Sequence, residues 1–119
     1  SQMRIAIFVS AALMTSYVIG EVISTNNVEI TFVNVGQGDG AVIQAPYRFN
    51  VLIDGGGGNS YSDYNPGEKV YLDYLETEGI TKADSAFVSH YHQDHVQGII
   101  AAMENIKVRN LFQHSLLRL

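Results

Sequence analysis

The sequence predicts a mixed α/β (α+β) fold built from short strands and amphipathic helices. Runs of β-branched residues bounded by glycine or proline alternate with segments whose apolar residues recur at helical spacing. The composition agrees, because 119 residues with 46% apolar and 16% charged side chains are typical of one small globular domain with a modest core. No internal repeat or low-complexity tract interrupts this pattern.

The N-terminal segment is expected to be separate from the domain. Arg4 precedes an apolar run over 5–19, which is shorter than the ~20 residues of a comfortable membrane helix. The basic start and the small residues near Gly20 favour a secretory signal peptide cut before Glu21. A retained membrane anchor and a buried core helix or strand pair are the alternatives. We therefore expect a signal peptide or membrane anchor over 1–20, a domain over 21–119, and an extracytoplasmic (secreted, periplasmic or membrane-anchored) location.

The first part of the domain predicts a β-meander. The run at 28–35 is rich in β-branched residues, and further strands are expected at 41–45 and 49–54. The turn GQGDG and Pro46 separate these strands, and the glycines at 55–58 open a loop.

Helices and strands alternate in the second part. Asn65 as cap, Pro66 as first residue and Gly79 as stop predict a helix over 65–79. A strand over 83–89, a helix starting at Val96 and a strand over 107–113 are expected to follow. The residues expected to face the core are Leu72 and Leu75, or Tyr71, Tyr74 and Leu75, in the first helix, and Val96, Ile99, Ile100 and Met103 in the second.

The stretch SHYHQDHVQG, residues 89–98, contains three of the four histidines. If the strand stays extended past Ser89, then His90, His92 and Asp94 project to one side, and His95 joins them as the chain turns. Imidazole and carboxylate groups suit zinc, with manganese or iron as competitors. The absence of cysteine excludes a thiolate metal site, a cysteine nucleophile and a disulfide framework.

Simpler roles exist for the same residues. Asp94 with Gln97 resembles a capping box for the following helix, and His90 and His92 could be surface imidazoles. The pattern His-x-His-x-Asp-His between an apolar strand and an amphipathic helix favours a metal site over these roles, because chance rarely produces it. Capping and ligation could also coexist at Asp94.

The motif SHYHQDH resembles the metal-binding signature of the metallo-β-lactamase superfamily. The stretches VNVGQGDGAVIQAP and FNVLIDGGG are similar to the opening of the hydrolase domain of ComEC competence proteins, and the likeness covers residues 28 to about 110. It implies a metallo-β-lactamase-like αββα sandwich of which this chain supplies the N-terminal half. It also implies two zinc ions in the full domain. The implied roles are first-zinc ligands for His90 and His92, second-zinc ligands for Asp94 and His95, orientation of the site for Asp54, and a position near the site for Asp39.

Two departures from that family limit the site. Two glycines usually follow the histidine motif, whereas Gln97 precedes Gly98 here, which changes the packing at the helix start. In the family a third histidine, a bridging aspartate and a last histidine come from the later part of the domain. His114 arrives too early for such a ligand and is expected to be an ordinary polar residue. The four ligands of this chain alone would therefore form an open, weak site beside an uncovered sheet edge.

The glycine-rich stretches do not predict a nucleotide site. GQGDG leads into a strand and so lacks the helix N-terminus that holds a pyrophosphate, and DGGGG lacks the Gly-Lys-Ser or Gly-Lys-Thr ending of a Walker loop. The loop over 55–58 is expected to be a flexible turn or, by the resemblance, to let the backbone pass close to the metals.

The expected activity is metal-dependent hydrolysis by a metal-bound hydroxide, with catalytic roles for Asp94 and Asp54. The DNA-uptake role of the competence proteins favours a phosphodiester in nucleic acid, or another phosphate ester, as substrate. The net charge of −5 nevertheless provides no broad positive surface for a polyanion. An acyl hydrolase acting on a lactam, lactone or thioester, and an inactive metal-binding fragment that needs a second half, are the alternatives. Membrane contact is expected only through the N-terminal segment.

Overall fold

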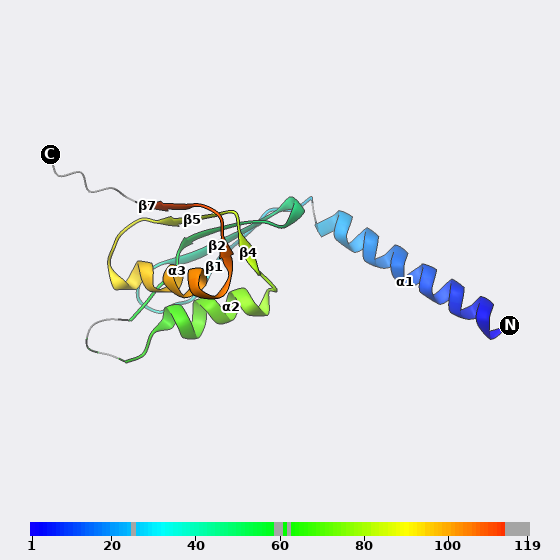
Figure 1. The fold of residues 1–119 in the computed structure, drawn as a ribbon, viewed down its shortest axis with the longest axis horizontal. Helices are drawn as coiled ribbons and strands as arrows, with labels where there is room; N and C mark the ends of the chain where they lie inside the picture. Colours follow the sequence, from blue (N-terminus) through cyan, green and yellow to red (C-terminus); the bar gives the residue numbers. More distant parts are fainter. Residues whose placement is uncertain (25, 59–60, 62, 114–119) are drawn as a thin grey trace.

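The computed structural model describes residues 1–24, 26–58, 61 and 63–113. A long N-terminal helix projects from a mixed α+β body (Figure 1), which confirms the predicted mixture of helices and strands. The described elements are α1 (Gln2–Ser24), β1 (Glu29–Phe32), β2 (Gly40–Ala45), the short helical turn η1 (Pro46–Arg48), β3 (Phe49–Asp54), the π-helical turn η2 (Gly67–Tyr71), α2 (Leu72–Thr77), β4 (Lys82–Ala83), β5 (Ser85–Val88), α3 (Gln93–Asn105), β6 (Lys107–Val108) and β7 (Leu111–Gln113).

Helix α1 is longer than the sequence suggested. Its segment Gln2–Gly20 is long and apolar enough to cross a membrane, and none of it is buried against the body. Nineteen helical residues rise about 28 Å, close to the ~30 Å hydrocarbon core of a bilayer. The Thr15 hydroxyl donates to the Ala11 carbonyl at 2.8 Å, so this polar group is satisfied within the helix. A buried core helix or strand pair is therefore wrong for this segment, and α1 fits a signal peptide or a membrane anchor.

Five of the described strands form one mixed sheet in the order β1-β2-β3-β5-β7. The predicted meander is confirmed, because β1, β2 and β3 pair antiparallel with Glu29 opposite Gln44 and Gly40 opposite Asp54. Strands β5 and β7 then run parallel to β3. The strand expected over 28–35 is shorter, since β1 ends at Phe32 and the chain turns back with Val33 N–H bonded to Gly40.

The strand expected over 107–113 is split between two sheets. Strand β6 pairs with β4, and β7 pairs with β5. The break lies at Arg109 and Asn110, where Arg109 N–H donates to Ala83 and the Asn110 carbonyl accepts from Ala86 N–H. The strand over 83–89 is likewise divided into β4 and β5.

Helices α2 and α3 lie on the same side of the sheet (Figure 1). Of the two faces weighed for the first of these helices, the tyrosine-containing one is correct, because Tyr71 and Leu75 are fully buried and Tyr74 packs against the core. The helix begins after Pro66, and the Asn65 side chain accepts a hydrogen bond from Gly67 N–H at 2.9 Å, as a cap does.

The buried face of α3 is rotated relative to the prediction. Ile99 is buried and Val96 packs against the core, but Ile100 and Met103 are about half exposed. Alanines at 101 and 102 are buried in their place. The cause is the close contact between Gly98 of α3 and Gly55 of the glycine loop, residues 55–58. This contact turns the face of α3 that contains residues 98, 99 and 102 inward.

The opposite face of the sheet is apolar and exposed. Phe32, Ala41, Ile53, Phe87 and Phe112 lie in one row across the five strands. The three phenylalanines of this row are exposed, with 83% for Phe32 and 50% for Phe112, whereas Ile53 is partly buried and Ala41 is buried. The rings of Phe87 and Phe112 stack 4.9 Å apart. None of the described helices covers this row, since α2 and α3 both pack on the other face.

The buried hydroxyl of Tyr71 predicts a loss of stability at high pH. It donates to the Ala41 carbonyl at 3.0 Å, and burial, with smaller effects of Asp54 and Tyr74, raises its pKa well above the ordinary value of 10.0. The unfolded chain releases this proton above pH 10.0 while the folded chain keeps it, so the free energy of unfolding falls by about 1.4 kcal/mol per pH unit from this group. Urea unfolding above about pH 10 should show a steeper loss of stability in the wild type than in Tyr71→Phe, with a difference that approaches this one-proton slope at about pH 11. Equal slopes would contradict it.

Candidate metal centre

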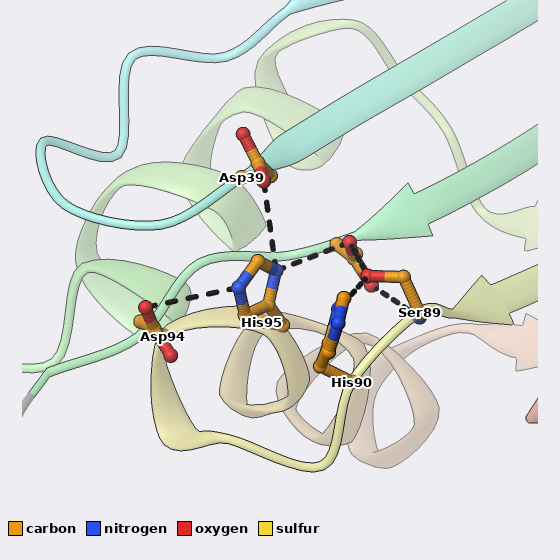
Figure 2. Close-up of polar contacts among 6 residues, drawn as sticks. Asp39, Ser89, His90, Asp94 and His95 are labelled. Carbon is orange, nitrogen blue, oxygen red and sulfur yellow. Dashed lines mark hydrogen bonds and ion pairs between the residues drawn. The ribbon is translucent and has the colours of Figure 1, made fainter. Parts of the chain in front are cut away.

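The predicted site residues gather at one end of the sheet (Figure 2). Asp39 precedes β2, Asp54 is the last residue of β3, and Ser89 and His90 follow β5. Asp94 and His95 lie in the first turn of α3. Segments far apart in the sequence thus bring carboxylates and imidazoles together, because β3 and β5 are parallel neighbours that end at the same edge.

The histidine cluster does not continue the strand as predicted. Strand β5 ends at Val88, and α3 begins at Gln93 with His92 as its N-cap. The His92 carbonyl accepts from the backbone N–H groups of His95 and Val96, which starts the helix earlier than the predicted Val96. Asp94 therefore projects from a helix and does not alternate with His90 and His92 along a strand.

The capping box of Asp94 and Gln97 is also wrong. Asp94 lies inside the first turn of α3, one residue beyond Gln93, and is not the N-cap. The Gln97 side chain instead accepts a hydrogen bond from Gly58 N–H at 2.7 Å. The Gln97 side chain thus connects the glycine loop, residues 55–58, to α3.

Asp54 contacts both Ser89 and His95. It is 3% exposed, and its backbone adopts a left-handed φ of 49°, which is uncommon for a residue other than glycine. Its Oδ1 accepts from Ser89 N–H at 2.8 Å, and its Oδ2 accepts from the Ser89 hydroxyl at 2.5 Å. The same Oδ2 lies 3.2 Å from His95 Nδ1. Backbone strain at a buried, fully bonded carboxylate is typical of a functional site.

These contacts determine which ring nitrogens carry protons. A carboxylate only accepts hydrogen bonds, so Nδ1 of His95 must be the protonated nitrogen. The Ser89 hydroxyl donates its proton to Asp54, so at 3.1 Å it can only accept from His90 Nδ1. In the neutral form of each ring, Nε2 then carries a bare lone pair, and this is the form that binds a metal ion.

The open side of His95 faces Asp94. Its Nε2 lies 3.7 Å from Asp94 Oδ2, and two ligands about 2.1 Å from one tetrahedral zinc ion lie roughly 3.4 Å apart. The ring of His90 lies beside that of His95, and the two ring centroids are 5.3 Å apart (Figure 2). The structure therefore places Asp94 at ligand-like distance from His95 Nε2, with the His90 ring beside that of His95.

A second grouping competes with the predicted one. Ligand atoms of Asp39, Asp54 and His95 all lie within 4.8 Å of one another. The Asp39 carboxylate is 3.7 Å from His95 Nδ1, and its side chain is 81% exposed. We favour the Nε2 side of His95 as the metal-binding side, because Asp54 already accepts three hydrogen bonds. One of these comes from His95 Nδ1, so Asp54 orients the ring as an outer-sphere partner.

His92 lies at the margin of this arrangement. It is exposed, and its ring centroid is 6.3 Å from that of His90. It lines a cavity of about 400 Å³ together with Asp94, Gln37 and the loop glycines Gly57 and Gly58. His92 and Asp94 thus share one hollow, although no direct contact between them is among the described interactions. His114 lies outside the described residues.

The glycine loop is held firmly against α3. Gly55 N–H donates to the His95 carbonyl at 2.8 Å, and Gly98 N–H donates to the Gly56 carbonyl at 3.1 Å. A methyl group at Gly57 would overlap the Gln93 carbonyl, so only glycine permits this approach. The expectation of a flexible turn is therefore wrong, and the loop positions the helix turn that carries Asp94 and His95.

Ser89 is the site residue that the sequence did not single out. It precedes the first histidine and connects Asp54 to His90, a role that only the pairing of β3 with β5 creates. A serine at the end of a strand is too common to signal this role by itself.

Comparison with known proteins supports a relation to competence proteins. No family model matches the chain, and no solved structure matches it. The chain is similar to ComE operon protein 3 of Bacillus subtilis (strain 168), with 34% identity over 93 residues. The match covers 70% of this chain and 12% of that protein, so the chain spans only a small part of its relative.

Proposed function

We propose that the chain forms part of a metal-dependent hydrolase directed at phosphodiesters, in nucleic acid or a related phosphate ester. The single observation that carries this proposal is that Asp94 faces His95 Nε2 beside the His90 ring, while Nδ1 of His95 contacts Asp54 directly and Nδ1 of His90 contacts it through Ser89. Similarity to ComE operon protein 3 supports the choice of a competence-related substrate.

The donor set fits a borderline divalent ion such as zinc. It offers imidazole nitrogens from His90, His92 and His95 and a carboxylate from Asp94, with Asp54 as the outer partner that orients two of the rings. Manganese and iron accept the same donors. An ion held there would supply a Lewis acid that lowers the pKa of bound water toward ~7. Asp39 is exposed and lies on the Nδ1 side of His95, opposite to the proposed metal-binding side, where it is placed to accept a proton.

A metallo-β-lactamase-like sandwich is the architecture we propose for the complete domain. One sheet with helices on one face corresponds to half of such a sandwich. The opposite face carries the apolar row from Phe32 to Phe112, and an apolar sheet face of this kind is normally covered by another layer. The same face favours a second candidate: a metal-binding fragment that is inactive until a second half covers it.

Helix α1 is proposed to hold the domain at the outer side of a membrane. Arg4 lies at its N-terminal end, and basic residues favour the cytoplasmic side of a membrane span. The segment Gln2–Gly20, with 19 residues, is long and apolar enough to cross a membrane.

Zinc binding and turnover by the full chain in detergent test the proposal. We expect zinc uptake that drops by at least about 100-fold in affinity in His92→Ala and Asp94→Ala, because each removes a ligand. Gln93→Ala, which alters an exposed neighbour in the same hollow, should keep the wild-type affinity. Unchanged zinc affinity in both ligand variants would contradict the site.

Substrate choice is tested with a bis-aryl phosphodiester, single-stranded DNA and a chromogenic lactam. Turnover of the phosphodiesters that disappears in Asp94→Ala would support the proposal. Turnover of the lactam alone would contradict the phosphodiester assignment and favour acyl hydrolysis. Zinc binding without turnover of any of them would favour the inactive fragment.

A further inference from the structure

The turn between β2 and β3 is strained and exposed. Tyr47 and Arg48 adopt left-handed φ values of 62° and 56°, which residues other than glycine rarely adopt, and here two occur in succession. Two successive residues of this kind make the tight turn that joins the antiparallel strands β2 and β3. Tyr47 is 87% exposed and Arg48 is exposed, so the turn presents an aromatic ring and a guanidinium at the surface.

The topology places this turn beside the end of α1. Helix α1 ends at Ser24 and β1 begins at Glu29, so at most about 18 Å of extended chain separates them. Glu29 pairs with Gln44, which precedes Tyr47 by three residues. The hairpin points to the side of the body from which α1 leaves (Figure 1), and the candidate metal centre lies at the other end of the same strands.

A cavity of about 530 Å³ lies at this end of the sheet and contains none of the candidate metal ligands. Tyr47, Arg48 and Lys82 line it together with the carboxylates Glu29 and Glu78. Cations and carboxylates side by side suit a zwitterionic phospholipid headgroup, whose phosphate and ammonium need one of each. Val28 and Phe49, 60% and 49% exposed, add apolar surface at the same end.

We propose that the Tyr47–Arg48 turn docks on the zwitterionic headgroups of the membrane that α1 crosses. Tyrosine and arginine are suited to this layer, because each has an apolar part that can enter the membrane boundary and a polar end that stays hydrated. The docked turn and α1 together fix the body with its metal centre directed away from the membrane. The inference rests on α1 as a retained membrane span and is independent of the metal chemistry.

The natural chain contains no tryptophan, so one tryptophan introduced into the turn is the only source of tryptophan fluorescence. The full-length Tyr47→Trp chain is reconstituted into phosphatidylcholine vesicles in which part of the lipid carries bromine on its acyl chains. We expect a blue-shifted emission, loss of most of the emission to the brominated lipid, and little quenching by aqueous iodide. Tyr61→Trp is the matched control, since Tyr61 is 97% exposed in the loop that follows β3 at the far end of the sheet. It should respond to iodide and not to bromine.

Each other outcome overturns the proposal. Iodide quenching as strong in Tyr47→Trp as in Tyr61→Trp, with no effect of brominated lipid, would mean that the turn stays in water. Equal bromine quenching of the two variants would mean that the body lies on the membrane without preference for this turn. A chain that does not co-float with vesicles would lack the membrane span on which the docking depends. Zinc affinity measured on the same samples shows independently whether the metal centre is intact.

Discussion

Gly98→Ala is expected to destabilise the body by more than about 3 kcal/mol, or to unfold it. Alanine is the better helix former by ~1 kcal/mol, so in an open helix position the substitution would stabilise. At Gly98 the added methyl group would overlap the carbonyl oxygen and Cα of Gly55. These are backbone atoms, and they cannot move aside as a flexible side chain can. The sign of the change therefore separates close packing from helix propensity.

The measurement is urea unfolding of the full chain in detergent, followed by circular dichroism. Gly20→Ala is the matched control, because Gly20 is also helical and nothing lies within 4 Å of its added methyl group. The control should leave the unfolding of the body unchanged. Stability equal to or above the wild type in Gly98→Ala would show that the loop and α3 are not in close contact.

Local patterns predicted most of the strands and the composition of the site. The apolar runs at 41–45 and 49–54 predicted β2 and β3, because strand-forming residues bounded by glycine and proline are a local signal. The split of 107–113 into β6 and β7 could not be seen, because it depends on hydrogen bonds to Ala83 and Ala86 from another part of the chain.

The site shows the same division between local and non-local information. The histidines and Asp94 stand out by spacing, whereas the start of α3 at Gln93 depends on how the chain turns after Val88. Ser89 could not be recognised, since its role needs Asp54 from a neighbouring strand. The rotation of α3 onto Ile99 and Ala102 likewise follows from a glycine contact that periodicity does not record.

Asp54→Asn is expected to lower the zinc affinity by about 10- to 100-fold while leaving the fold intact. The amide has the shape of the carboxylate, but one of its ends donates hydrogen bonds. Its oxygen must face Ser89 N–H, which now donates to Oδ1, so its NH₂ group takes the place of Oδ2. There it meets Nδ1 of His95 and the Ser89 hydroxyl.

Both imidazoles must then change tautomer. An NH₂ group facing His95 Nδ1 forces that nitrogen to accept, which moves the ring proton to Nε2, the side that faces Asp94. The Ser89 hydroxyl accepts from the amide and donates to His90 Nδ1, so the His90 proton moves to Nε2 as well.

Nitrogen-15 NMR of the metal-free chain should show protonated Nδ1 on both rings in the wild type and protonated Nε2 in the variant. Asp73→Asn, which removes one negative charge from the exposed surface of α2, should change neither the tautomers nor the affinity. Outer-sphere partners of metal ligands typically change metal affinity by ~10- to 100-fold. If Asp54→Asn keeps Nε2 bare on both rings and binds zinc within about threefold of the wild type, then Asp54 does not control the tautomers of these rings.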